Sequence, residues 1–122
     1  MLQRGTIFKP ADNSGAKTFK LIGIPGNSKI RFAGVGDVVS VAINGASSTG
    51  VVKDHSIVKV LIVRTRKEVR RKDGSYVRFD DNAGVVVNND GSMVATRVFG
   101  PVAREIRDLG YLKVASLAKE VW

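Results

Sequence analysis

The chain has 122 residues, which is enough to bury a hydrophobic core in one domain without disulfides or metal ions. It contains no cysteine, which excludes a disulfide framework and any thiolate metal site. A net charge of +9 predicts an anionic partner. Nucleic acid is favoured over a membrane surface, because no basic amphipathic helix and no run of about 20 apolar residues is present.

The first part of the chain alternates between β-prone segments and clusters of turn-forming residues. Thr6–Lys9 predicts a short strand that stops at Pro10. Ala16–Ile24 predicts a longer strand in which Phe19 and Leu21 point to one side.

A basic segment follows, in which charged and apolar residues interleave over Asn27–Phe32. Lys29 and Arg31 are candidate phosphate contacts, and a solvated surface segment is the alternative. We expect Phe32 to be a core residue. A glycine-rich bend then leads into a predicted strand at Val38–Ile43, which is rich in β-branched residues.

The middle of the chain holds the strongest strand signals. Asn44–Gly50 predicts a polar loop and Val51–Ser56 a short edge strand. Ile57–Thr65 is a nearly continuous apolar run, which predicts a strand buried on both faces. Ala83–Asn88 predicts a return strand and Met93–Phe99 a last strand. Strands at this spacing predict a barrel of about five strands, which leaves no open edge.

The densest positive charge lies between two of these strands, over residues 64–79. Seven of the 20 basic residues fall there: Arg64, Arg66, Lys67, Arg70, Arg71, Lys72 and Arg78. In their midst, Asp73-Gly74 suits a two-residue hairpin turn, because both residues tolerate positive φ. The segment therefore predicts a β-ribbon that carries positive charge away from the barrel.

A two-residue turn would fix which side chains share a face of the ribbon. It places Arg71, Tyr76 and Arg78 on one face, where the Tyr76 ring could stack on a base or ribose, and Arg70 and Lys72 on the other. A three-residue loop would swap these faces. The alternative to nucleic-acid contact is a solvated hairpin, but an isolated two-stranded ribbon is marginal in water and its cations repel one another.

From residue 99 onward, the sequence pattern predicts helices in place of strands. Pro101 predicts the first position of a helix, because its missing N–H would be unpaired there. The helical spacing places Val102, Ile106 and Leu109 on one face. Gly110 suits the left-handed residue after a helix, and Leu112–Val121 predicts a second short helix.

The fold class expected from these segments is mainly β. We expect a single domain over residues 1–122, with a five-stranded small β-barrel and its basic β-ribbon (64–79) within residues 1–98. A short C-terminal helical segment occupies residues 99–122.

No motif predicts catalysis or metal binding. Asp54-His55-Ser56 contains the residue types of a catalytic triad, but contiguous residues cannot converge as a relay. Asp80-Asp81-Asn82 lacks the spaced oxygen ligands of a calcium loop, and Gly34-Val35-Gly36 lacks the third glycine of a dinucleotide fingerprint. We therefore expect no enzyme, no cofactor and no metal, and a small hydrolase is the least favoured function.

Six segments of the chain together form a distinctive pattern: Ala11–Ala16, Ala33–Asp37, Ile62–Thr65, Arg70–Ser75, Arg78–Ala83 and Thr96–Val102. A signature of shorter motifs accompanies them: Leu61-Ile62-Val63, Asp73-Gly74, Phe79, Asn82 and Val85-Val86. Over nearly the whole chain and in one collinear order, these segments and motifs resemble the universal large-subunit ribosomal protein number fourteen, in its bacterial or organellar form.

The resemblance implies a five-stranded barrel with a projecting ribbon and a small helical region. It implies binding to large-subunit rRNA, a position on the intersubunit face, contacts with neighbouring ribosomal proteins and a bridge to small-subunit rRNA. It places the protein in ribosomes of the bacterial cytoplasm or of an organelle matrix. It further implies a docking surface for a ribosome-silencing factor, with Thr96, Arg97 and Lys113 at the matching positions.

The leading hypothesis is a structural protein that neutralises rRNA phosphates during assembly. Its candidate rRNA-binding residues are Lys29, Arg31, Arg64, Arg66, Lys67, Arg70, Arg71, Lys72, Tyr76 and Arg78. The alternative is a free-standing small-barrel protein that binds single-stranded RNA or DNA. Aromatic residues argue against that alternative, because they make up only 7% of the chain and are scattered.

Overall fold

A computed structural model describes residues 2–25, 32–47 and 50–122, so the candidate contacts Lys29 and Arg31 lie outside the described residues. The elements are β1 (Ile7–Pro10), β2 (Ala16–Gly23), β3 (Val38–Ala46), β4 (Ile57–Arg64), β5 (Val69–Arg70), β6 (Tyr76–Val77), β7 (Ala83–Val87), α1 (Arg104–Asp108) and α2 (Leu112–Leu117). Among the described residues, no helix has the length and apolar character needed to cross a membrane.

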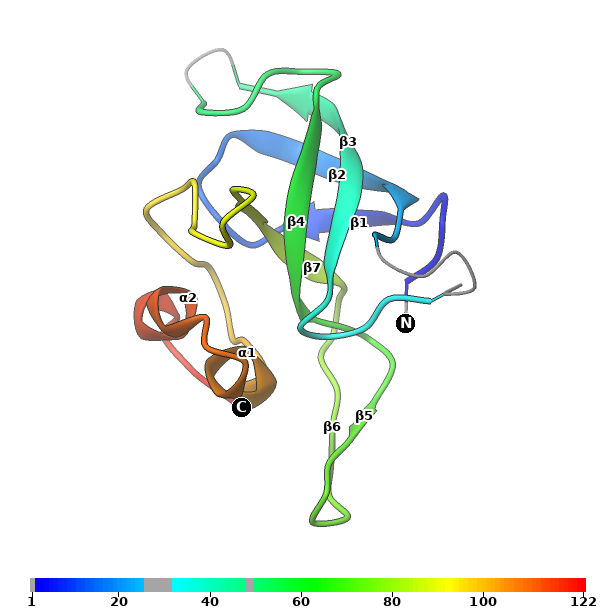
Figure 1. Ribbon diagram of the computed structural model, residues 1–122, viewed down its shortest axis with the longest axis vertical. Helices are drawn as coiled ribbons and strands as arrows, with labels where there is room; N and C mark the ends of the chain where they lie inside the picture. The colour runs from blue at the N-terminus through cyan, green and yellow to red at the C-terminus, as the bar shows by residue number, and fades with distance from the viewer. Residues whose placement is uncertain (1, 26–31, 48–49) are drawn as a thin grey trace.

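Five strands form a closed barrel in the order β1-β2-β3-β4-β7 (Figure 1), which confirms the predicted architecture. Neighbouring strands are antiparallel except where the barrel closes. There β1 runs parallel to β7, and Lys9 and Pro10 pair with Ala83 and Gly84. Pro10 ends β1, a position that suits a residue without an N–H. Closure leaves every strand of the barrel paired on both sides.

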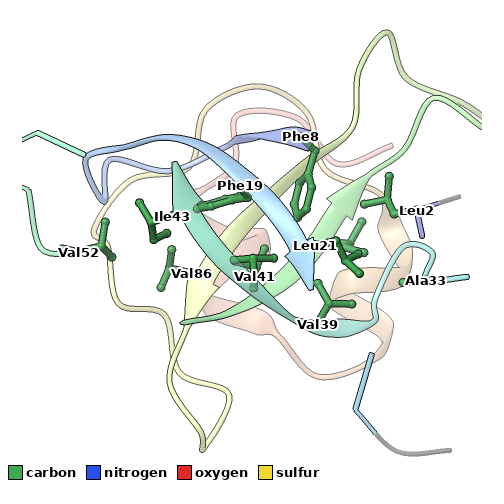
Figure 2. Packing of buried hydrophobic residues seen from close by; sticks show 12 residues of the cluster. Leu2, Phe8, Phe19, Leu21, Ala33, Val39, Val41, Ile43, Val52 and Val86 are labelled. Atoms are coloured by element: carbon green, nitrogen blue, oxygen red, sulfur yellow. The ribbon is translucent and has the colours of Figure 1, made fainter. Parts of the chain in front are cut away.

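The barrel core gathers apolar side chains from all five strands. Figure 2 shows Phe8 and Phe19 together inside the barrel, with ring centroids 5.4 Å apart and planes at 62°, an edge-to-face arrangement. The barrel core comprises Leu2, Phe8, Phe19, Leu21, Ala33, Val39, Val41, Ile43, Val52, Val60, Ile62 and Val86.

A second group of buried residues, the outer cluster, packs the C-terminal segment against the outside of β4 and β7. It comprises Ala11, Leu61, Val63, Ala83, Val85, Val87, Met93, Ala95, Val98, Val102, Ile106 and Val114. Alternate residues of β4 thus enter different clusters: Val60 and Ile62 the barrel core, Leu61 and Val63 the outer cluster. The prediction that this strand is buried on both faces is confirmed from Val60 onward.

Two predictions around β3 are wrong. The strand continues to Ala46, inside the predicted polar loop, because Ala46 pairs with Ala16 and Asn44 with Thr18 in β2. The predicted edge strand at Val51–Ser56 is absent. Turns replace it, and His55 has a φ of 62°.

The predicted last strand at Met93–Phe99 is also wrong. This segment makes only two isolated bridges, Val87 with Met93 and Asp12 with Val98. The barrel is already closed by β1 and β7, so no sheet edge remains for a sixth strand. The segment crosses the outside of the barrel instead.

The C-terminal helices are shorter than predicted. α1 begins at Arg104, not at Pro101, because the preceding backbone is extended and bound elsewhere: Val102 N donates to Glu120 O (3.0 Å) and Ala103 N to Val63 O (3.0 Å). α2 ends at Leu117, since Val121 bridges to Val102. Gly110 follows α1 with a φ of +97°, as predicted. Leu109, which follows the last residue of α1, is exposed, whereas Ile106 within the helix is buried.

Gly84→Ala is expected to lower the free energy of unfolding by about 1–3 kcal/mol, because it overpacks the point where the barrel closes. A methyl group at Gly84 would clash with Val60 and lie 2.9 Å from the Leu61 carbonyl oxygen. Urea unfolding of the full chain measures the change. Gly34→Ala is the control, since a Cβ there meets nothing within 4 Å. Similar losses in both variants would contradict the close packing at Gly84.

Candidate nucleic-acid interface

The basic ribbon leaves the barrel between β4 and β7 and projects beyond it, with helix α1 beside it (Figure 1). Its paired part is short. Only β5 and β6 form a ladder, in which Val69 faces Val77 and Arg70 faces Tyr76. The remaining residues of the predicted ribbon form its base and its tip.

The tip is a three-residue loop, so the predicted two-residue turn is wrong. Arg71 N donates to Ser75 O (2.9 Å) and Gly74 N to Arg71 O (3.0 Å). Gly74 has a φ of +88°, the left-handed conformation expected after a turn in such loops. Asp73 stabilises the loop by accepting hydrogen bonds from the Ser75 hydroxyl (2.6 Å) and amide (3.0 Å), which lower the pKa of its carboxyl.

The longer loop shifts the pairing by one residue, so Tyr76 shares a face with Arg70 and not with Arg71 as predicted. Arg70 and Tyr76 now lie opposite each other on an exposed face, and Tyr76 is 61% exposed. A surface pocket near them is lined by Glu68, Tyr76 and Arg78. The pKa of Glu68 is lowered by a hydrogen bond from its own backbone and then by the charges of Lys67 and Arg78. The exposed face is thus a cationic surface that carries an accessible aromatic ring.

The opposite face packs toward helix α1 through Arg71. Its Nε donates to Glu105 Oε1 at 2.7 Å, and its Nη2 to Glu105 Oε2 at 3.5 Å and to the main-chain oxygen of Trp122. The Arg71 side chain is only 16% exposed. Burial raises the pKa of Glu105, but the hydrogen bond from Arg71, a backbone hydrogen bond and the charges of Arg71 and Arg104 together lower the pKa overall. The pair ties the ribbon to α1.

The base of the ribbon is held by the buried guanidinium of Arg64. Its Nε donates to Asp81 Oδ1 at 2.7 Å, and its Nη1 to the carbonyl oxygens of Phe99 (2.9 Å) and Pro101 (3.1 Å). Gly100 lies against this guanidinium with a φ of +77°, and a Cβ there would lie 2.6 Å from Nη1. A side chain at position 100 would therefore displace Arg64.

Backbone and side-chain hydrogen bonds complete the base. Arg66 N donates to Asn82 Oδ1 (2.9 Å), Phe79 N to Thr65 O (3.0 Å), and the Thr65 hydroxyl to Lys67 O (2.9 Å). The first two bonds join the two arms of the ribbon below the paired strands, and the third lies within one arm.

The seven ribbon cations predicted to bind RNA therefore fall into two sets. Five of them, the exposed ribbon cations, are Arg66, Lys67, Arg70, Lys72 and Arg78. Arg64 and Arg71 instead point inward and bind carboxylates. Sequence reasoning missed both acidic partners, because Asp81 and Glu105 lie 17 and 34 residues away along the chain. The segment Asn27–Phe32 adds only Phe32 to the described residues, and Phe32 is 51% exposed, contrary to its predicted burial.

The three residues matched to a docking surface lie on two elements that share the outer cluster. Thr96 and Arg97 are exposed between the buried residues Ala95 and Val98. Lys113 is exposed on α2, next to the buried Val114. Sequence reasoning missed a contact next to this surface: the side chain of Asn13 hydrogen-bonds to Thr96 and Arg97.

No catalytic or metal-binding constellation occurs in the part of the chain that the structure describes. No three residues among its His, Cys, Asp and Glu side chains converge as metal ligands. His55 lies 3.5 Å from Asp54, and its side chain is 84% exposed. Asp54 and His55 are adjacent residues of one turn, so their closeness follows from the chain and does not indicate a catalytic pair.

The comparison with known families concerns the whole chain. A family model described as ribosomal protein L14p/L23e matches residues 1–122. The match spans the barrel, the ribbon and the C-terminal helices, and it agrees with the resemblance drawn from the sequence motifs.

Arg64→Ala is expected to lower the free energy of unfolding by about 2–4 kcal/mol, because it leaves Asp81 and two carbonyl groups without their donor. Thermal or urea unfolding of the full chain measures the loss. The matched control is Arg66→Ala, which removes an exposed guanidinium from the same arm and should change stability by less than about 0.5 kcal/mol. Equal effects would argue against a structural role for Arg64.

The Arg71–Glu105 pair predicts a pH-dependent contribution to stability. The pKa of Glu105 is lower in the folded chain than its ordinary value of 4.5, so the pair stabilises fully above pH 4.5 and is lost as the pH falls through the folded pKa. Glu105→Gln should therefore lower the free energy of unfolding at pH 7 by about 1–2 kcal/mol, with a smaller difference from the native chain at pH 3. Asp108→Asn, on the same helix, is the control. A difference that does not change with pH would contradict the ion pair.

Proposed function

The chain belongs to the ribosomal protein L14p/L23e family, and we propose that it binds large-subunit rRNA through the exposed ribbon cations. Members of this family are structural proteins of the large ribosomal subunit and not enzymes. We further propose that the protein lies at the intersubunit face, contacts neighbouring ribosomal proteins and contributes to a bridge with small-subunit rRNA. The ribosomes would be those of a bacterial cytoplasm or an organelle matrix.

The observation that carries the RNA-binding proposal is the division of the ribbon's cations. The five exposed ribbon cations lie on a short, projecting hairpin whose acidic residues are Glu68, 3.8 Å from Lys67, and Asp73. The positive charges remain in excess, and bringing them together is unfavourable without a further anionic partner. Phosphates would offset this repulsion, and the release of their counterions favours binding. For Arg64 and Arg71, which were also predicted to bind RNA, we propose a structural role instead, because their guanidinium groups already bind Asp81 and Glu105.

Tyr76 gives the exposed face a second means of contacting RNA. Its ring is accessible and lies across the ladder from Arg70. Aromatic rings stack on unpaired bases, and an adjacent guanidinium can bind the neighbouring phosphate. Lys29 and Arg31 remain proposed as further rRNA contacts.

A second surface is proposed for protein partners. Thr96, Arg97 and Lys113 are exposed, two of them are cationic, and the outer cluster supports both elements that carry them. We assign this surface to the docking of a ribosome-silencing factor. It lies on segments separate from the ribbon, so RNA contact and factor docking can be tested independently.

The double variant Arg70→Glu and Lys72→Glu is expected to weaken incorporation into large subunits at least tenfold, because it reverses two phosphate-binding charges. Lys17→Glu with Lys53→Glu is the control of equal charge change. Lys17 lies where β2 meets the end of β3, and Lys53 lies between β3 and β4, whereas the ribbon leaves from the opposite end of β4. Sedimentation of large subunits reconstituted with each variant gives the comparison.

The salt dependence of binding gives a second readout of the same contact. Five phosphate contacts predict a slope of about −3.5 to −4.5 in a plot of log affinity against log salt concentration, and the double variant should reduce it by about 1–2. A slope near zero, or equal incorporation of the two double variants, would refute the assignment of RNA binding to the ribbon.

A further inference from the structure

We propose that Asn13, in the turn between β1 and β2, positions Thr96 and Arg97 for partner docking. The inference rests on the proposed docking surface and adds to it a residue outside that surface. Asn13 would act through the segment that it holds, so it is a positioning residue and not a contact for the partner.

The segment Met93–Phe99, which carries Thr96 and Arg97 and is called the docking segment here, needs such support, because it belongs to no strand or helix. Between Met93 and Phe99, the described backbone binds the barrel backbone near its two ends, where Val94 N donates to Val86 O (3.2 Å) and Phe99 N donates to Ala11 O (2.6 Å). Thr96 and Arg97 lie between these points, and both are exposed. Their orientation is therefore not set by a β-ladder.

The side chain of Asn13 supplies the missing contacts. Its Oδ1 accepts hydrogen bonds from Thr96 N and Arg97 N, each at 3.0 Å, and its Nδ2 donates to Thr96 Oγ1 at 3.0 Å. Two consecutive backbone amides and one hydroxyl are thus bound by a single carboxamide. The two N–H donors require the oxygen of the carboxamide on their side, which fixes its orientation.

The turn that carries Asn13 is itself anchored to the barrel. The buried carboxylate of Asp12 accepts hydrogen bonds from Val86 N (2.8 Å) and the Ser14 hydroxyl (2.7 Å). Ala11 O accepts a hydrogen bond from Phe99 N at 2.6 Å. The barrel therefore holds Asn13 in place, and the hydrogen bonds of Asn13 hold the docking segment against the barrel.

Loss of the Asn13 side chain would release only the middle of the segment. The bridge at Met93 would remain, and Phe99 would stay bound to Ala11 and Arg64. Asn13 is exposed and outside both hydrophobic clusters, so its removal leaves the packing intact. Thr96 and Arg97 would then lose their fixed orientation, while the ribbon would be unaffected.

An aspartate at position 13 provides a conservative test. One carboxylate oxygen can still accept the hydrogen bonds from Thr96 N and Arg97 N. The Thr96 hydroxyl, which accepts from the amide of Asn13, can rotate and donate to the other oxygen. Asn13→Asp should therefore preserve the position of the segment, whereas Asn13→Ala should not.

The experiment measures three full-length variants: Asn13→Ala, Asn13→Asp, and Arg97→Glu with Lys113→Glu. Purified ribosome-silencing factor from the same cell is titrated against each, rRNA binding is measured in parallel, and amide hydrogen exchange is followed at Thr96 and Arg97. We expect Asn13→Ala to weaken factor binding about tenfold and to expose both amides to exchange. Its rRNA affinity and the protection of the β7 amides should match the native chain, and Asn13→Asp should restore factor binding.

The outcomes separate this inference from the docking surface itself. If the Arg97 and Lys113 double variant loses factor binding but Asn13→Ala binds normally, the positioning role is wrong and the docking surface stands. If the double variant binds normally, the docking surface is wrong, and with it the role of Asn13 in docking. Equal loss of factor binding in Asn13→Ala and Asn13→Asp would also overturn the hydrogen-bonding account.

Discussion

The guanidinium group of Arg64 is the contact on which the arrangement of barrel, ribbon and C-terminal segment depends. Arg64 is the last residue of β4. Its guanidinium binds the carboxylate of Asp81, which lies between β6 and β7, and donates to the carbonyl oxygens of Phe99 and Pro101. Burying a charge is unfavourable unless it is paired and hydrogen-bonded, and here one carboxylate and two carbonyl groups meet that need. The planar guanidinium makes four hydrogen bonds here, two of them to the same Asp81 carboxylate, whereas a lysine carries only three donors on one nitrogen. The base of the ribbon is therefore rigid where it leaves the barrel.

The number of basic residues in the ribbon does not show how many of them are free to bind RNA. Its seven basic residues divide into two that bind Asp81 and Glu105 and five that face outward. The inward pair fixes the direction of the ribbon against the C-terminal segment and α1. The outward set, with Tyr76, supplies the surface that we assign to rRNA. A hairpin this short would be marginal alone, so its binding surface depends on its structural contacts.

The sequence could predict those features that depend on local pattern. The apolar run of β4 indicated burial on both faces, and the structure divides its residues between the barrel core and the outer cluster. The failures have a common cause in contacts between distant residues. Met93–Phe99 has the composition of a strand, but the closed barrel offers it no edge. Pro101 suits a helix start, but the neighbouring backbone is bound to Val63 and Glu120. In the candidate site, the exposed Arg70 and the inward Arg71 are adjacent and identical in sequence, and only the loop length and Glu105 distinguish them.

The most direct measurement is a high-resolution structure of a large ribosomal subunit that contains this chain. Our account predicts rRNA phosphates within hydrogen-bonding distance of the exposed ribbon cations, with the Arg64–Asp81 and Arg71–Glu105 pairs intact. It would be contradicted by a ribbon that faces solvent, or by Arg64 and Arg71 turned away from their carboxylates and onto phosphates.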